Sequence, residues 1–203
     1  MIYIFENTDT LGDDFLKAAI PLLSLQRLKK IDKMRIDSDK INSAAVYLML
    51  RFALKEQYGI SEKPQFIYGE HGKPYLKDTQ EIYFSLSHCR NACACIVSDK
   101  ETAVDITDTR RISLRTATYF CSKAEFESIN TLSEKNNELV KLWSAKECYS
   151  KLDGSGLSTD FKKIGKEQLK DIHTIKGDKY YLAYYSQKEE SAKKLSSSNL
   201  LYI

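Results

Sequence analysis

Two long helices, each followed by a glycine, place the strongest limit on how this 203-residue chain folds. The first is predicted from Asp37 or Ser38 to about residue 58, with Gly59 as its C-cap. The second is predicted from about Ser133 to residue 152, ahead of Gly154. Each comes after a short apolar strand, so the same order of elements occurs twice at an offset of about 100 residues. The chain is therefore predicted to be α+β, with two similar halves packed together.

Shorter elements are predicted around these helices from apolar runs, turns and caps. Helices are expected at 11–20 and 22–34, separated by Pro21, and after a capping box that begins at Ser122. The Ser-Ser-Ser run at 196–198 is interpreted as a loop. Strands are expected at 2–5, 65–68, 81–86, 92–97, 102–106, 171–175, 179–185 and 199–203.

Charge and hydropathy argue against two classes of protein. The chain has 31 Lys and Arg against 28 Asp and Glu, which gives a formal charge of +3. This excess of basic residues is too small to suggest a nucleic-acid-binding protein by itself. The most apolar stretch, Ala44 to Leu54, is interrupted by Arg51 and is shorter than the roughly 20 residues that cross a bilayer. The N-terminus turns acidic at Glu6 and does not resemble a signal peptide. We therefore expect neither nucleic acid nor membrane as a partner.

The chain has five cysteines, an odd number that favours a reduced, cytoplasmic protein. Cys93 and Cys95 alternate with alanines, which is typical of a strand that buries small side chains. The alternative is a metal site formed by these two residues with Cys89, but their spacing fits no common zinc pattern.

The second long helix carries the first candidates for chemistry. Trp143, Glu147 and Lys151 follow one another at four-residue steps, so they lie along one face of the helix. On helix statistics alone, Glu147 and Lys151 form an ordinary surface pair that contributes about 0.2–0.5 kcal/mol. The alternative is that both side chains face a cleft and take part in a reaction.

Other polar residues stand at places where apolar ones are expected or where strands end. Asp105 interrupts the apolar strand TAVDI; it either reaches solvent or forms, with Glu147, an oxygen-rich site of the kind that magnesium prefers. Ser87 and His88 follow the strand expected at 81–86, and His88 is either structural or a hydrogen-bond donor to phosphate. The basic run at 27–35 is either a solvated helix face or a phosphate-binding surface.

Taken in order, these segments resemble the 4′-phosphopantetheinyl transferases of the Sfp type. The resemblance covers roughly residues 20 to 160, and its last motif is specific by itself. The motifs are Gly72-Lys73-Pro74, Phe84-Ser85-Leu86-Ser87-His88, Val104-Asp105-Ile106, and WSAKECYSK at 143–151 followed by Gly154-Ser155-Gly156-Leu157. The resemblance implies two α/β halves in a pseudo-twofold arrangement, residues 1–100 and 101–203, with the active site and coenzyme A between them.

The resemblance also implies transfer of 4′-phosphopantetheine from coenzyme A to a serine of an apo acyl, peptidyl or aryl carrier protein, with release of 3′,5′-ADP. Magnesium is the usual metal. By position, Asp105 and Glu147 would bind the metal, Glu147 would help to deprotonate the carrier serine, and Lys151 would stabilise the departing phosphate. The chain would act as a monomer, since a pseudo-dimeric chain needs no second copy. The positions that would bind coenzyme A are Arg27, Lys30, Ser43, Lys73, Pro74, Ser87 and His88.

Some positions depart from the family's pattern. Thr107 stands where a second acidic residue is usual beside Asp105, so a water or the Thr107 hydroxyl would replace that ligand. Asn42 stands where an arginine is frequent, and Leu86 where asparagine is common. The missing carboxylate motivates one alternative, a family member that binds coenzyme A or a carrier protein without turnover. The basic run motivates another, a nucleic-acid-binding module with strongly salt-dependent binding.

Overall fold

The computed structural model describes residues 1–79, 81–110 and 112–203. The strands are β1 (Ile2–Glu6), β2 (Phe66–Tyr68), β3 (Pro74–Leu76), β4 (Tyr83–His88), β5 (Ala92–Ser98), β6 (Ala103–Asp108), β7 (Ile172–Lys176), β8 (Tyr180–Tyr185) and β9 (Ala192–Leu195). The α-helices are α1 (Asp13–Ala19), α2 (Leu25–Ile31), α3 (Asp37–Tyr58), α4 (Leu114–Phe120), α5 (Lys123–Asn130), α6 (Lys135–Asp153), α7 (Lys166–Leu169) and α8 (Ser197–Leu201). Short 3-10 turns lie at Thr8–Thr10, Ile20–Leu22, Gly156–Ser158 and Phe161–Lys163.

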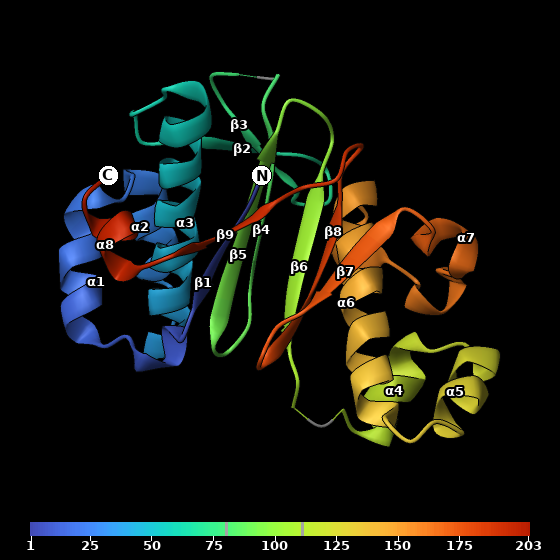
Figure 1. Cartoon of the computed structure of the whole chain (residues 1–203). Coiled ribbons are helices and arrows are strands. Elements are labelled where there is room, and N and C mark those ends of the chain that lie inside the picture. Colours follow the sequence, from blue (N-terminus) through green and yellow to red (C-terminus); the bar gives the residue numbers. More distant parts are fainter. Residues whose placement is uncertain (80, 111) are drawn as a thin grey trace.

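The elements form four layers, with helices outside and two sheets inside (Figure 1). The first sheet has the strand order β4-β5-β1-β9, and the second has the order β6-β8-β7. Helix α3 covers the first sheet on β5, while α6 covers the second on β6 and β8. The sheets contact each other through β4, β5 and β6. The predicted α+β class is confirmed, and the twofold relation between the halves stays a prediction.

Strand β1 shows why the two sheets stack. Successive side chains of a strand point to opposite faces. Ile2 and Ile4 belong to a core shared with β6 and β8 of the second sheet. Tyr3 and Phe5 point the other way, into the core under α3. All four side chains are at most 5% exposed, so β1 is buried on both faces.

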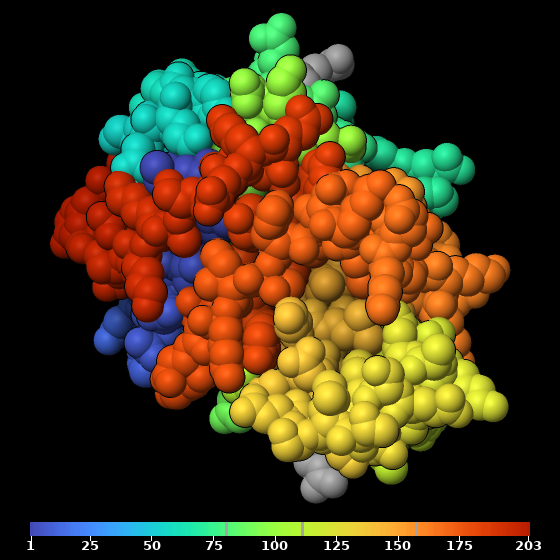
Figure 2. Space-filling view, turned by 45° about the vertical axis from the view of Figure 1, so that its right-hand side comes forward, coloured from blue at the N-terminus to red at the C-terminus, as the bar shows by residue number. Residues whose placement is uncertain are grey.

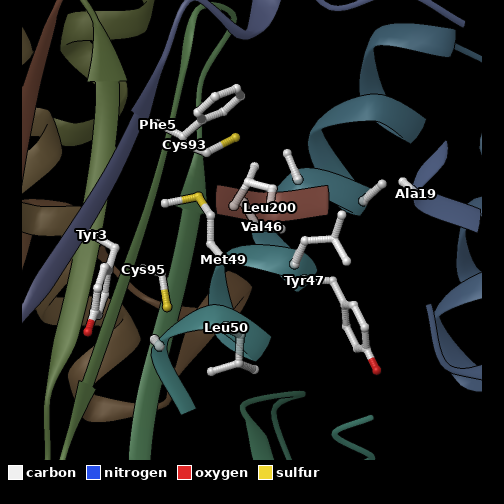
Figure 3. Close-up of a cluster of buried hydrophobic side chains, with 14 of the residues drawn as sticks. Tyr3, Phe5, Ala19, Val46, Tyr47, Met49, Leu50, Cys93, Cys95 and Leu200 are labelled. Carbon is white, nitrogen blue, oxygen red and sulfur yellow. The ribbon is translucent and has the colours of Figure 1, made fainter. Parts of the chain in front are cut away.

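The core on the helix side is built from the first sheet and α3. Cys93 and Cys95 of β5 point toward Met49 and Leu50 of α3 (Figure 3). Both cysteines are completely buried, and this burial raises their pKa well above the usual value. They fill space as small apolar side chains, as their alternation with alanine predicts.

The end of the chain departs from the sequence-based expectation. The prediction of a strand at 199–203 is wrong, because residues 197–201 form α8. Ser196, in the run interpreted as a loop, instead caps this helix by accepting a hydrogen bond from the backbone N–H of Asn199, and Leu200 packs into the core under α3. Strand β9 pairs in parallel with β1, so the last residues lie beside the N-terminal elements (Figure 2). Strand β9 and α8 belong to the C-terminal half by sequence but pack with the N-terminal elements, so they depart from the predicted division at residue 100. The division itself stays a prediction.

Other boundaries differ by less. The helices expected at 11–20 and 22–34 are shorter, with Pro21 in a 3-10 turn between α1 and α2. Strand β3 and helix α4 were not expected from the sequence pattern. In the part of the chain that the structure describes, every helix is too short or too polar to cross a bilayer.

Candidate active site

Asp105 lies at the centre of the candidate site, on β6, and is only 5% exposed. Its Oδ1 accepts hydrogen bonds from Ser87 Oγ at 2.9 Å and Lys151 Nζ at 2.7 Å. Its Oδ2 accepts from Thr107 Oγ1 at 2.8 Å and Ser144 Oγ at 3.1 Å. Burial acts to raise the pKa of Asp105, but the charge of Lys151 and the hydrogen bonds outweigh it and hold the pKa below its usual value. Asp105 is therefore a fixed negative charge inside the fold.

Elements of both sheets meet at this carboxylate. Ser87 lies near the end of β4 in the first sheet, whereas Asp105 lies in the second sheet and Lys151 on α6. The Ser87 hydroxyl donates to Asp105 and accepts from Lys151 Nζ at 2.8 Å and from the backbone N–H of Ile106 at 3.2 Å. One donor and two acceptor positions are the full capacity of a hydroxyl. Ser87, predicted to contact phosphate, thus holds the two sheets together here.

Glu147 lies one helical turn before Lys151 and lines a cavity of about 540 Å³ together with Asp105. The side chain is half-buried and makes no hydrogen bond or ion pair with any residue that the structure describes. Burial raises the pKa of Glu147, and the negative charge of Asp105 raises it further, against a smaller opposing effect of Lys151. A carboxylate in this setting is suited to accept a proton or to bind a cation.

The donor set of this cavity fits magnesium. Magnesium usually binds one or two protein carboxylates and takes its other ligands from water and substrate phosphate. Asp105 and Glu147 both line this cavity, and the negative charge of Glu147 has no cation within ion-pair distance among the described residues. Asp105 already accepts four hydrogen bonds, so a cation would bind it in place of one of these donors, such as the Lys151 ammonium on Oδ1. In the same part of the chain, no group of three or more His, Cys, Asp and Glu side chains is arranged to hold a metal. Any further ligands must come from other oxygens, water or phosphate.

A second cavity, of about 220 Å³, is lined by the residues predicted to hold the 3′-phosphate end of coenzyme A: Arg27, Lys30, Ser43 and His88. Arg27 is only 7% exposed; its Nη1 donates to Ser43 Oγ at 3.1 Å, and its guanidinium lies 5.1 Å from the ring centre of Tyr47. Within the described residues no carboxylate forms an ion pair with Arg27. A buried cation without an anionic partner is expensive unless an anion binds beside it.

His88 connects the two cavities, because it lines both. Its partly desolvated position, with the charges of Lys151 and Lys30, lowers its pKa. A neutral histidine there still donates one hydrogen bond to a ligand. Asn42, by contrast, uses its amide within the fold: Nδ2 donates to the Cys89 carbonyl at 3.4 Å, and Oδ1 accepts from the Cys93 thiol at 3.9 Å.

A third cavity, also of about 220 Å³, extends the cleft toward the end of α6. It is lined by Lys73 and Lys151 and shares Pro74, Phe84 and Leu86 with the cavity of Arg27. The cavity of Arg27 thus shares lining residues with each of the other two, so the three cavities are adjacent, with Asp105 and Glu147 on one neighbour and Lys73 on the other.

Lys73 has a structural role beside the one predicted for it. Its ammonium donates to the carbonyl of Leu152 at 2.8 Å and pairs with Glu101 at 3.1 Å, so it caps the C-terminus of α6. Gly154 and Gly156 follow with positive φ of 79° and 53°. A Cβ on Gly156 would lie 3.2 Å from the carbonyl oxygen of His71. Glycine thus lets the end of α6 pack against the turn that carries Lys73.

Two residues of the helix motif have roles that the sequence did not suggest. Ser144 is completely buried and reaches Asp105, although its position beside Trp143 carried no signal for this. Lys146 is also completely buried, and its ammonium donates to Glu125 Oε2 at 2.8 Å and to the carbonyls of Phe120 and Phe161, both at 2.9 Å. Lys146 therefore ties α4, α5 and the turn at residues 161–163 to α6, on the side away from the cleft carboxylates.

Comparison with known proteins agrees with the motifs. Residues 101–199 match the model of the 4′-phosphopantetheinyl transferase superfamily. The chain is 31% identical over 114 residues to the 4′-phosphopantetheinyl transferase Sfp of Bacillus subtilis, which covers 55% of this chain and 51% of that protein. It is 30% identical over 143 residues to the transferase ffp of Bacillus subtilis, covering 68% of this chain and 64% of that protein.

A eukaryotic relative extends the comparison. The L-aminoadipate-semialdehyde dehydrogenase-phosphopantetheinyl transferase of Candida glabrata is 26% identical over 156 residues, covering 72% of this chain and 60% of that protein. The chain thus spans between 51% and 64% of the length of these three relatives. The resemblance drawn from the motifs is confirmed by these matches.

Proposed function

We propose that this chain, a member of the 4′-phosphopantetheinyl transferase superfamily through residues 101–199, transfers 4′-phosphopantetheine from coenzyme A to a serine of an apo carrier protein. The serine oxygen forms the new bond to phosphorus, the pyrophosphate bond breaks, and 3′,5′-ADP leaves. The observation that carries this proposal is the distribution of charge along the cleft. Asp105 and Glu147 line one cavity, and the buried Arg27 guanidinium, which has no carboxylate partner among the described residues, lines another, as an elongated, multiply phosphorylated ligand with a metal requires.

In this proposal Asp105 and Glu147 would hold magnesium, which would supply charge neutralisation on the pyrophosphate. Glu147, directly or through a water, accepts the proton of the carrier serine. Lys151, 2.7 Å from Asp105, is close enough to the carboxylates to stabilise the charge on the departing phosphate.

The other predicted residues, apart from Ser87, whose hydroxyl is fully hydrogen-bonded within the protein, bind and orient coenzyme A. Arg27, Lys30 and His88 hold the 3′-phosphate end, with Ser43 orienting the Arg27 guanidinium through its 3.1 Å hydrogen bond. Lys73 and Pro74 line the adenine side of the cleft. Holding the reactants in place supplies much of the rate in phosphoryl transfer, because little covalent chemistry falls to the protein.

The partner in this proposal is an apo carrier protein with an acidic helix. The exposed Arg90 lines the cavity of Glu147 and would attract that helix, whereas Arg110 on the same cavity is paired with Asp108 at 2.6 Å. We extend the proposal to a monomeric enzyme in the cytoplasm, the setting that its five cysteines favour. The activity is tested by mixing the chain with coenzyme A, magnesium and an apo carrier and measuring the mass of the carrier.

Arg27→Met is expected to weaken coenzyme A binding by about 10- to 100-fold, since a hydrogen-bonded charged pair contributes about 1.5–3 kcal/mol. Calorimetric titration with coenzyme A and with its form lacking the 3′-phosphate measures the effect. The wild-type chain should prefer intact coenzyme A, and the variant should lose most of that preference, since Lys30 and His88 remain. The control is Lys29→Met, an exposed cation of the same helix, which should bind as the wild type does. A variant that keeps the preference would contradict the role of Arg27.

A further inference from the structure

The carboxylate of Asp105 is held by two hydroxyl groups whose role the proposed transfer does not specify. Thr107 Oγ1 and Ser144 Oγ both donate to Oδ2, at 2.8 Å and 3.1 Å, while Oδ1 is bound separately by Ser87 and Lys151. A carboxylate held at one oxygen can still rotate, whereas donors on both oxygens fix its plane. Thr107 and Ser144 together fill both acceptor positions of Oδ2, so a cation would bind Asp105 at Oδ1, in the position of the Lys151 ammonium. Thr107 and Ser144 therefore determine how Asp105 faces the cavity.

Local geometry explains how each hydroxyl reaches Oδ2. Thr107 follows Asp105 by two residues on β6, and side chains two apart on a strand share a face. Ser144 lies on α6 three residues before Glu147, so the two are one helical turn apart on the same helix. The hydrogen bond from Ser144 thus connects the strand that carries one carboxylate to the helix that carries the other.

Thr107 differs from a metal ligand in what its hydroxyl does. A glutamate at this position brings a second negative charge, while the threonine hydroxyl is neutral and has a single proton, which points at Asp105. Ser144 is completely buried, 0% exposed, so it can act only through the groups that it contacts. Both residues hydrogen-bond a carboxylate that would bind the metal. Hydrogen bonds of this kind orient the metal ligand and strongly affect metal affinity.

We propose that Thr107 and Ser144 are positioning residues that fix the orientation of Asp105 relative to Glu147 for binding a divalent cation, with Thr107 contributing a hydrogen bond to Asp105 in place of a third carboxylate. This inference rests on the proposed function, because it takes Asp105 and Glu147 as the cation ligands. It predicts that loss of either hydroxyl weakens cation binding, while the variant still folds and binds coenzyme A in the absence of metal as the wild type does.

The test uses Mn²⁺ as the cation, with free Mn²⁺ measured by electron paramagnetic resonance in the presence of saturating coenzyme A and without a carrier protein. Thr107→Val keeps the shape and removes the hydroxyl, Thr107→Ser keeps the hydroxyl, and Ser144→Ala removes the second donor. Thr107→Val and Ser144→Ala should each raise the Mn²⁺ dissociation constant by about tenfold, while Thr107→Ser stays near the wild type. Thr174→Val, the same substitution on β7, is the matched control and should have no effect.

Thermal unfolding and calorimetry of coenzyme A without metal check that each variant folds and binds its substrate. The proposal is overturned if Thr107→Val binds Mn²⁺ as the wild type does, or if Thr107→Ser loses as much affinity as Thr107→Val. It is also overturned if Ser144→Ala has no effect, because the orientation of Asp105 would then not be what determines cation binding. A wild-type chain that binds no Mn²⁺ would overturn it as well. A wild-type chain that binds Mn²⁺ with the predicted pattern but modifies no carrier would refute the proposed function and leave this inference standing.

Discussion

Glu147→Gln is expected to lower the rate of phosphopantetheine transfer by about 10²- to 10⁴-fold, the contribution typical of a positioned general base. The glutamine has nearly the same shape but no negative charge, so it accepts a serine proton poorly and binds a cation weakly. Glu147 has no partner among the described residues, and therefore its replacement leaves no internal ion pair broken. Single-turnover kinetics with saturating coenzyme A and apo carrier measure the loss.

The same variant should bind coenzyme A at least as tightly as the wild type when magnesium is left out, because a negative charge near the pyrophosphate has been removed. Glu138→Gln is the matched control, since Glu138 lies on the same helix but lines a different cavity, beside α5 and α7. The control should transfer at the wild-type rate. Transfer by Glu147→Gln within about threefold of the wild-type rate would show that Glu147 is not the base.

Lys146→Met is expected to lower the free energy of unfolding by about 3 kcal/mol, the lower end of the cost of breaking a buried ion pair. Methionine fills a similar volume but leaves Glu125 and the carbonyls of Phe120 and Phe161 without their donor. The lower end applies because the Glu125 side chain is 22% exposed and also accepts from the Ser122 backbone N–H. Urea-induced unfolding followed by circular dichroism gives the value.

Lys141→Met serves as the control on the same helix, because Lys141 is exposed and its replacement should change the free energy of unfolding by no more than about 0.5 kcal/mol. A small effect of Lys146→Met, equal to that of the control, would mean that the buried ammonium is not what joins α4 and α5 to α6. Its position in the helix motif would then need a different explanation.

The elements with strong local signals could be predicted from the sequence. Helices α3 and α6 have apolar periodicity and closing glycines, β5 is an almost continuous apolar run, and β6 is an apolar run interrupted by Asp105. The tail could not be predicted in the same way, because α8 is only five residues long and β9 carries two lysines. Strand β9 forms by pairing with β1, almost the whole chain length away, and no local pattern reports that contact.

The positions of the site residues relative to one another could likewise not be predicted from local sequence patterns. Arg27, Lys30, Ser43 and His88 come from separate segments, and only the resemblance to a family predicted that they line one cavity. The roles of Ser144 and Lys146 could not be predicted, because a motif gives the residue and not the direction of its side chain. Ser87 illustrates the difference: it lies where it was expected, but its hydroxyl is bonded within the protein.

The most direct test of the central claim is the mass of apo carrier proteins after incubation with the purified chain, coenzyme A and magnesium. Carriers from fatty-acid, polyketide and peptide synthesis are compared with the same carriers whose acceptor serine is replaced by alanine. The account predicts that at least one carrier gains the mass of one phosphopantetheine group, only with magnesium and only when its serine is present. If the chain binds coenzyme A but every carrier keeps its original mass at all magnesium concentrations, the chain is a binding protein and the proposed transfer is wrong.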